Sequence, residues 1–216
     1  MQELKYTLLS DGSSDRALIP ILSWLLRQHL GDISIQEQWA DLSRLRNRPR
    51  NLAEKINTSI YLYPCDVLFV HRDAEREPWQ KRLEEINQAV ANCNKLYTSV
   101  VRVIPVRMQE AWLLFDIVAL RNAAGNPSGN EPLELPRLSQ VEYLADPKQT
   151  LHDLLRCACG LQGRRRNRFI PEQAAVRVTE FAEDFSALRA LSAFQALEEE
   201  IKQFIATGMP SHSTAT

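Results

Sequence analysis

Short apolar segments and longer amphipathic segments alternate over the first 121 residues of the chain. The apolar segments, and one segment of alternating apolar and polar residues, predict four strands, at residues 6–10, 33–39, 66–71 and 99–106. Apolar residues at helical spacing predict intervening helices at about 14–30, 52–61, 78–92 and 111–120. This alternation is typical of an α/β fold, in which helices connect parallel strands.

The strand at residues 66–71 indicates how the sheet is covered, because its residues Val67 to Val70 are all apolar. Such a strand is expected in a parallel sheet with helices on both faces. The strand at 33–39 instead alternates apolar and polar positions, which favours the edge of the sheet. We therefore predict a Rossmann-like, mostly parallel sheet with flanking helices.

The pattern changes after residue 121. Residues 122–147 are rich in Gly, Pro and Asn and predict a loop or lid. Residues 148–206 predict a helical C-terminal extension, with helices at 148–159, 171–183, 185–191 and 193–205. Residues 207–216 are small and polar and predict a disordered tail.

The composition is that of an ordinary globular protein, with 216 residues, 44% hydrophobic and 25% charged. Lys and Arg number 26 against 27 Asp and Glu, a balance that would argue against nucleic acid as a partner. Most of the basic residues, however, are arginines, and eight of these occur in two short runs. The runs are Arg44, Arg46, Arg48 and Arg50, and Arg164, Arg165, Arg166 and Arg168.

Both arginine runs are denser than a solvated surface requires, and Arg binds phosphate through two parallel hydrogen bonds. We expect the runs to bind a nucleic-acid backbone without sequence specificity. Aromatic residues are not interleaved with them, so stacking on bases is not indicated. The alternatives are pairing with an acidic partner protein or with the chain's own Glu198, Glu199 and Glu200.

The four cysteines do not form a recognisable disulfide framework, and Cys157 and Cys159 have no second pair that would suggest zinc. A signal peptide is not recognisable, and no apolar stretch reaches the length of a transmembrane helix. We expect a cytoplasmic protein that does not bind membranes.

Acidic residues follow three of the predicted strands, where open α/β sheets bind their ligands. They are Asp11 and Asp15, then Asp73 and Glu75, and finally Glu110. Asp73 and Glu75 lie two positions apart, so on an extended chain their side chains point to the same side. Converging carboxylates repel one another unless a cation lies between them, and Mg²⁺ or Mn²⁺ suits oxygen ligands. Solvated loops are the alternative, with Asp11 as a helix cap and Glu110 as an acid at a helix start.

Several segments resemble a known family. Residues 10–15, Ser-Asp-Gly-Ser-Ser-Asp, resemble the first motif of the toprim domain, and residues 70–75, Val-His-Arg-Asp-Ala-Glu, resemble its second motif. Residues 107–114, 146–151 and 188–194 are similar to segments of a poorly characterised family of stand-alone toprim-like proteins. The resemblance covers nearly the whole chain.

This resemblance implies a divalent-metal site for phosphodiester chemistry. The family acid at Asp11 is usually a Glu that acts as general acid and base, and the acids at Asp73 and Glu75 are usually two Asp that hold Mg²⁺. The resemblance thus implies Asp11, Asp73 and Glu75 as catalytic and metal-binding residues; Glu110 could complete the metal shell, and Arg72 could contact the phosphate. Asp11 is one methylene shorter than the family residue and Glu75 one longer, and a shift of about one ångström costs about a hundredfold in rate.

Two functions from different classes remain open. One is a Mg²⁺-dependent nuclease or related phosphodiester-processing protein, with analogy suggesting defence against foreign DNA. The other is a non-catalytic binding or regulatory subunit of a complex with a separately encoded ATPase. A small-molecule phosphotransfer enzyme is disfavoured, because the chain has neither a GxGxxG motif nor a P-loop.

Overall fold

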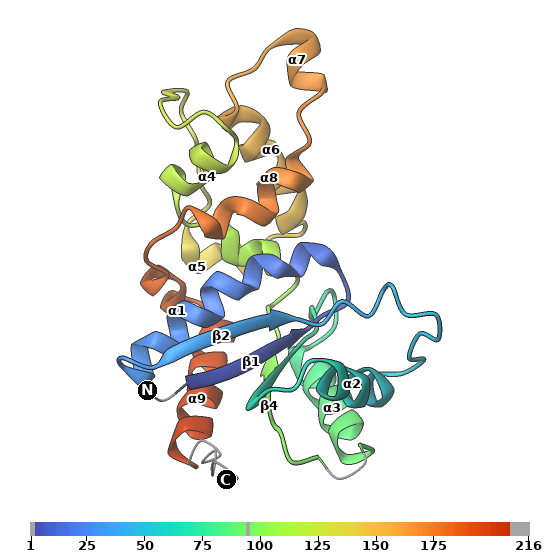
Figure 1. The fold of residues 1–216 in the computed structure, drawn as a ribbon. Coiled ribbons are helices and arrows are strands. Elements are labelled where there is room, and N and C mark those ends of the chain that lie inside the picture. The colour runs from blue at the N-terminus through green and yellow to red at the C-terminus, as the bar shows by residue number, and fades with distance from the viewer. Residues whose placement is uncertain (1–2, 94–95, 208–216) are drawn as a thin grey trace.

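Four parallel strands form the sheet at the centre of the protein (Figure 1). The structure is a computed structural model and describes residues 3–93 and 96–207. The strands are β1 (Glu3–Leu9), β2 (Ser34–Trp39), β3 (Val67–His71) and β4 (Ser99–Val103), in the order β2-β1-β3-β4. All neighbouring pairs are parallel, and β2 lies at an edge. These observations confirm the predicted Rossmann-like α/β architecture.

Helices cover both faces of the sheet, as the apolar sequence of β3 predicts (Figure 1). One face packs against α1 (Leu18–Leu30) and α9 (Ser192–Ala206), and it buries Tyr6 and Phe69. The other face packs against α2 (Leu52–Leu62) and α3 (Trp79–Ala91), and it buries Leu68. Successive residues of a strand point to opposite faces, so the internal strands need apolar residues at every position.

Two predicted boundaries near β4 are wrong. The strand expected at 99–106 ends at Val103, and Pro105, which has no amide hydrogen to donate to a sheet, lies just beyond it. The helix expected at 111–120 is instead the 3-10 helix η2 (Gln109–Leu113) followed by α4 (Ile117–Ala123). The side chain of Asp116 accepts hydrogen bonds from the first turn of α4 and so begins a new helix there.

The C-terminal half is helical, as predicted. The helices expected at 148–159 and 193–205 are found within one residue of their bounds, whereas those expected at 171–183 and 185–191 are shorter. Beyond α4 it contains α5 (Leu138–Val141), α6 (Pro147–Ala158), α7 (Gly163–Asn167), α8 (Pro171–Arg177), η3 (Val178–Glu180) and η4 (Ser186–Ala190), besides α9. The second arginine run therefore lies on and just after the short helix α7 rather than in a loop. This helical part shares one hydrophobic cluster with the sheet face under α1.

Three further predictions concern the loop or lid at 122–147, the tail at 207–216 and the absence of a transmembrane helix. The region 122–147 contains one short helix, α5, and is otherwise mostly irregular. The predicted disordered tail falls almost entirely on residues 208–216, which lie outside the described residues. Within the described ranges, no helix is long and apolar enough to cross a membrane.

Candidate functional site

The carboxyl ends of β1 and β3 form the point at which the strand order reverses. From β1 the chain passes to β2 on one side, and it then crosses to β3 on the other side of β1. In open α/β sheets, ligands bind in the crevice outside such a point. A cavity of about 300 Å³ lies here and is lined mainly by Asp11, Asp15, His71, Arg72, Asp73 and Glu75.

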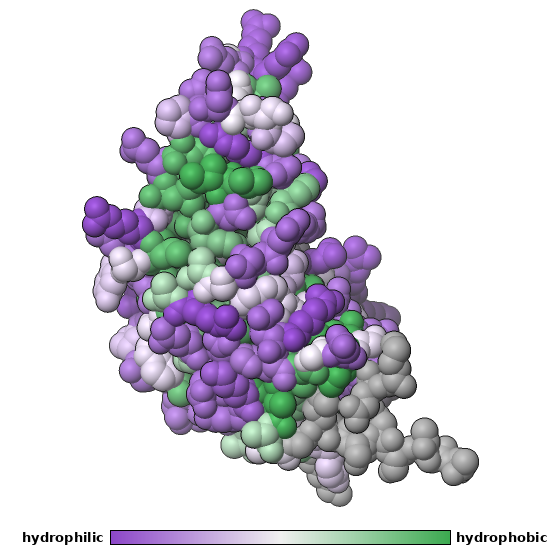
Figure 2. Space-filling view, turned by 90° about the vertical axis from the view of Figure 1, so that its left-hand side faces the viewer, coloured by the Kyte–Doolittle hydropathy of each residue, from purple (hydrophilic) through white to green (hydrophobic). Residues whose placement is uncertain are grey.

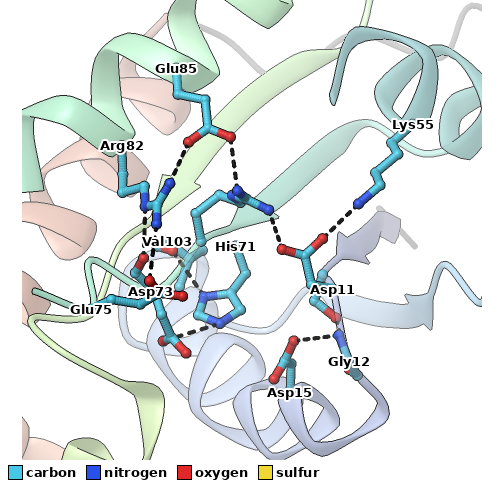
Figure 3. A network of polar contacts seen from close by, with 12 residues as sticks. Asp11, Gly12, Asp15, Lys55, His71, Asp73, Glu75, Arg82, Glu85 and Val103 are labelled. Atoms are coloured by element: carbon cyan, nitrogen blue, oxygen red, sulfur yellow. Dashed lines mark hydrogen bonds and ion pairs between the residues drawn. The ribbon is translucent and has the colours of Figure 1, made fainter. Parts of the chain in front are cut away.

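Asp11 lies between two cations rather than between other acids (Figure 3). Its carboxylate accepts a hydrogen bond from Lys55 Nζ of α2 at 2.7 Å, and its other oxygen pairs with Arg72. Arg72 also contacts Glu85 of α3 at 2.9 Å. Partial burial raises the pKa of Asp11, but the Lys55 hydrogen bond and the positive charge of Arg72 outweigh this and lower its pKa overall. Asp11 is therefore held in its charged form.

Asp73 and Glu75 do not share one direction, because the chain between them is not extended. Glu75 has a φ of 57°, in the left-handed region. Its exposed side chain lies beside Arg82 of α3 at 3.5 Å, while Asp73 turns toward His71 (Figure 3). We expected the side chains of Asp73 and Glu75 to point to the same side because the two residues lie two positions apart. This expectation is wrong.

The left-handed conformation of Glu75 has a local cause. Its amide donates a hydrogen bond to the carbonyl of Arg107 at 2.7 Å, and Arg107 itself has a φ of 66°. A non-glycine residue in this region costs about 1–2 kcal/mol. Neither residue is a glycine, so the chain keeps two strained positions joined by this hydrogen bond, and one of them, Glu75, lines the cavity. Such strain is concentrated at functional sites in proteins.

Asp73 is the most strongly perturbed acid of the site. Its pKa is raised to about 6, chiefly by burial; the charges of Glu110 and Asp15 act in the same direction, while His71 and the Gln109 amide act in the opposite direction. The Gln109 amide donates to Asp73 Oδ1 at 2.9 Å. Ionising Asp73 is therefore costly in the absence of a further positive charge.

His71 contacts both the backbone of β4 and the carboxyl of Asp73. Its Nδ1 lies 3.0 Å from the carbonyl oxygen of Val103, which can only accept, so Nδ1 carries a hydrogen. Its Nε2 lies 3.5 Å from Asp73 Oδ1 (Figure 3). A carboxylate and a bare ring nitrogen would repel each other, so this contact is favourable when one proton resides on His71 Nε2 or on Asp73.

Asp15 is buried and connects η1 (Ser13–Ala17) to the strand ends. It accepts hydrogen bonds from the Gly12 amide at 2.9 Å and from Gln109 Nε2 at 2.7 Å. Because a carboxylate only accepts, the Gln109 amide group must present its nitrogen to Asp15. Gln109 Oε1 is then left buried without a hydrogen-bond partner among the described residues. An orphaned buried oxygen between acids indicates a place for a cation or a water molecule.

Glu110 is the acid that η2 contributes to the surroundings of Asp73. Its side chain is 8% exposed and pairs with Lys148 Nζ of α6 at 3.2 Å. Neither Gln109 nor Lys148 was expected in the site from the sequence, although they lie in the segments 107–114 and 146–151, respectively, which resemble the toprim-like family. That resemblance was the only available signal for either residue.

No protein-family model matches this chain, and no curated protein or solved structure matches it.

The donor set fits a cation held by few protein ligands. In the part of the chain that the structure describes, no three His, Cys, Asp or Glu side chains are grouped closely enough to hold one ion together. Mg²⁺ is commonly held by one or two carboxylates, water and substrate phosphate oxygens. The raised pKa of Asp73 and the free oxygen of Gln109 are consistent with such a site, because a cation there would offset the repulsion from Glu110 and Asp15.

The two arginine runs lie in different surroundings. In the loop before α2, Arg44 pairs with Asp41 at 3.3 Å, and Arg48 lines a cavity of about 320 Å³ that also contains Asp11 and Lys55. In contrast, α7, which carries three arginines of the second run and is followed directly by Arg168, lies at the far end of the helical part (Figure 1). The structure thus places Arg48 of the first run in a cavity that shares Asp11 with the acidic cavity of about 300 Å³, and it places the second run away from both.

Proposed function

We propose that the chain is a toprim-like protein that processes phosphodiester bonds of nucleic acid with a divalent cation. The observation that carries this proposal is the perturbed acid Asp73, placed at the sheet's switch point with Glu110 and Asp15 around it. A perturbed carboxylate in a cleft, beside charged partners, is typical of catalytic and metal sites. The cavity also offers cations suited to a phosphate, since Arg72 lines it and Lys55 contacts Asp11 at its border.

Asp73 and Glu110 would hold the Mg²⁺, with Gln109 Oε1 as a neutral oxygen donor nearby. Bound there, the ion would polarise the phosphate and stabilise the charge that develops on its oxygens. The geometry favours Glu110 over Glu75 in this role, because Glu110 raises the pKa of Asp73 whereas Glu75 is exposed beside Arg82. The assignment of Glu75 from the resemblance stays a prediction.

The chain's own residues provide the remaining functions. While the ionised Asp73 holds the cation, His71 Nε2, which lies 3.5 Å from Asp73 Oδ1, would carry the proton and pass it to a leaving oxygen. Asp11 keeps a low pKa, so we propose that it orients Lys55 and Arg72 toward a phosphate rather than donating a proton. On substrate binding, the phosphate would replace Asp11 as the partner of Lys55 and Arg72.

The decisive experiment incubates purified protein with plasmid and single-stranded DNA in Mg²⁺, in Mn²⁺ and in EDTA. We expect cleavage that needs the cation, and a loss of about a hundredfold or more for Asp73→Asn. Glu110→Gln should lose nearly as much, and Glu75→Gln much less. Asp153→Asn is the matched control, because Asp153 is an exposed acid of α6 that pairs with Arg156. Equal cleavage by Asp73→Asn and Asp153→Asn would contradict the proposed site.

A second candidate is a non-catalytic, toprim-like binding subunit of a complex with a separately encoded ATPase. The observation that favours it is the pairing of Asp11 with two cations and of Glu75 with Arg82, which occupies two of the three acids that the resemblance implies as catalytic. Calorimetric titration with Mn²⁺ separates the two functions. Binding that disappears in Asp73→Asn supports the enzyme, whereas nucleic-acid binding without cation binding or cleavage supports the subunit.

A further inference from the structure

A second cavity, of about 530 Å³, lies at the far end of the helical part, between the end of α4 and the α7–α8 segment. We call it the arginine pocket, and its principal lining residues are Leu161, Arg165, Arg168, Phe169, Ala174 and Arg177. Its size lies within the range of small-molecule binding sites. Figure 2 shows hydrophilic residues at the tip of the molecule above an area of apolar residues.

The charge of the arginine pocket is unbalanced. Among the described residues that line it there is no acidic side chain. Within the described ranges, Arg165 and Arg168 have no ion pair, and Arg177 pairs only with Glu180, at 3.5 Å. Arginines kept together without acidic partners repel one another, and a bound anion would offset that repulsion.

The floor of the arginine pocket is apolar. Leu161 and Ile170 are 39% and 49% exposed, and Phe169 contributes an aromatic ring. The guanidinium of Arg177 already stacks on Phe181 at 5.0 Å from the ring centre. An occupant that satisfies both parts of the pocket therefore needs a flat apolar body and a negative charge.

We propose that the arginine pocket binds an unpaired nucleotide of single-stranded nucleic acid. The base lies on the apolar floor, and the phosphate lies against Arg165 and Arg168. A base inside a duplex cannot enter, because it is stacked and paired there. This inference rests on the proposed function and adds a substrate class to it: nucleic acid with an unpaired segment.

The helix α8 connects the arginine pocket to the acidic cavity. It lines the pocket with Ala174 and Arg177, and it packs against η1, which carries Asp15. A strand anchored in the pocket would therefore have to pass α8 and η1 to reach the acidic cavity. A non-specific backbone contact, as expected for the second arginine run from the sequence, would not use this apolar floor, which is contributed mainly by Leu161, Phe169 and Ile170 on either side of the run.

The test compares two double variants with the same change in charge. Arg165→Ala/Arg168→Ala removes two arginines that line the pocket, and Arg164→Ala/Arg166→Ala removes two from the same run that do not. Fluorescence anisotropy in EDTA measures binding of a labelled single-stranded oligonucleotide and of a blunt duplex of equal length. We expect the wild type to prefer the single strand, and the first variant to bind it about tenfold more weakly than the second. The two variants should bind the duplex alike.

An isosteric pair provides an independent readout that does not shorten any side chain. Gln173→Glu places a negative charge in the pocket, whereas Gln162→Glu places one just outside it. Only Gln173→Glu should weaken single-strand binding clearly. If it weakens binding no more than Gln162→Glu does, the proposal is overturned.

The remaining outcomes separate this inference from the proposed function. Equal losses in the two arginine variants overturn the pocket alone and leave the proposed function standing. Poly-glutamate that competes as well as the oligonucleotide also overturns it, and identifies an acidic protein segment as the occupant. Absence of any nucleic-acid binding by the wild type overturns both proposals. Selective single-strand binding without cation-dependent cleavage supports the pocket and contradicts the enzyme.

Discussion

The acidic cavity and the arginine pocket use charge in opposite ways. In the cavity, acids and bases are interleaved, so that Asp11, for example, faces both Lys55 and Arg72. At the pocket, Arg165 and Arg168 stand without acidic partners among the described residues. Paired charges in a partly buried site fix positions and shift pKa values, whereas unpaired surface charges attract a ligand without shaping the fold. The near-zero net charge of the chain conceals this division.

The largest expected effect concerns Asp73, whose pKa rises to about 6 from 3.8. The fold favours its protonated form, so this contribution to stability is complete below pH 3.8 and is lost as the pH rises through about 6. At neutral pH in EDTA, Asp73→Asn should therefore raise the free energy of unfolding by about 1–3 kcal/mol. The gain should shrink toward zero near about pH 4, and urea denaturation at several pH values measures it.

Asp153→Asn is the control, because Asp153 is exposed and its substitution should show no such trend. If Asp73→Asn raises the free energy of unfolding equally at every pH, the raised pKa of Asp73 is contradicted. Added Mg²⁺ should reduce the difference between wild type and Asp73→Asn, because the cation stabilises the ionised carboxyl of the wild type.

A smaller effect is expected at the pair of Lys148 and Glu110. Lys148→Met leaves the buried Glu110 without its cation and should lower the free energy of unfolding by about 1–2 kcal/mol. Lys81→Met is a matched control, since Lys81 pairs with Glu77 at 3.1 Å on the exposed surface of α3 and should lose about 0.5 kcal/mol or less. Chemical denaturation of both variants checks this; equal losses would mean that burial of Glu110 does not strengthen the pair.

The smallest effect on stability is expected at α7. Replacing Arg164, Arg165, Arg166 and Arg168 together by Gln should change the free energy of unfolding by less than about 0.5 kcal/mol, because their side chains are exposed. The same variant should reduce the salt dependence of single-strand binding, by about 0.7 in the log–log slope for each lost phosphate contact. Thermal unfolding and anisotropy titrations at several salt concentrations measure the two quantities. A marked loss of stability would show that the arginines hold the tip of the molecule together.

Local patterns in the sequence predict the sheet well. The continuous apolar residues of β3 and the alternation in β2 correctly indicate an internal strand and an edge strand. Helix boundaries that depend on a single residue are harder to predict. Asp116 is an example: its side chain caps α4, although the apolar periodicity alone would continue one helix through this position. The strand order β2-β1-β3-β4 was not predicted, and this order is what brings Asp11 and Asp73 to the same cavity.

The contacts of the site could not be predicted in the same way. Glu75 leaves the expected direction because of its left-handed backbone, which no residue type at that position signals. Lys148 reaches Glu110 across 38 positions of sequence, and Gln109 connects Asp15 to Asp73 through one side chain and one amide. These are tertiary pairings between loop ends, and neither periodicity nor spacing encodes them.

The placement of α9 also has a consequence for how the protein is made. The helix α9 packs against β4. β4 ends at Val103, but α9 begins only at Ser192, far along the chain. On a ribosome that adds about 5–20 residues per second, the part of the sheet face under α9 stays uncovered for about 5–20 s after β4 is synthesised. Apolar side chains of this face are then open to chaperones or to aggregation. Slow translation between these two elements would lengthen that interval and lower the yield of folded protein, while leaving the stability of the finished protein unchanged.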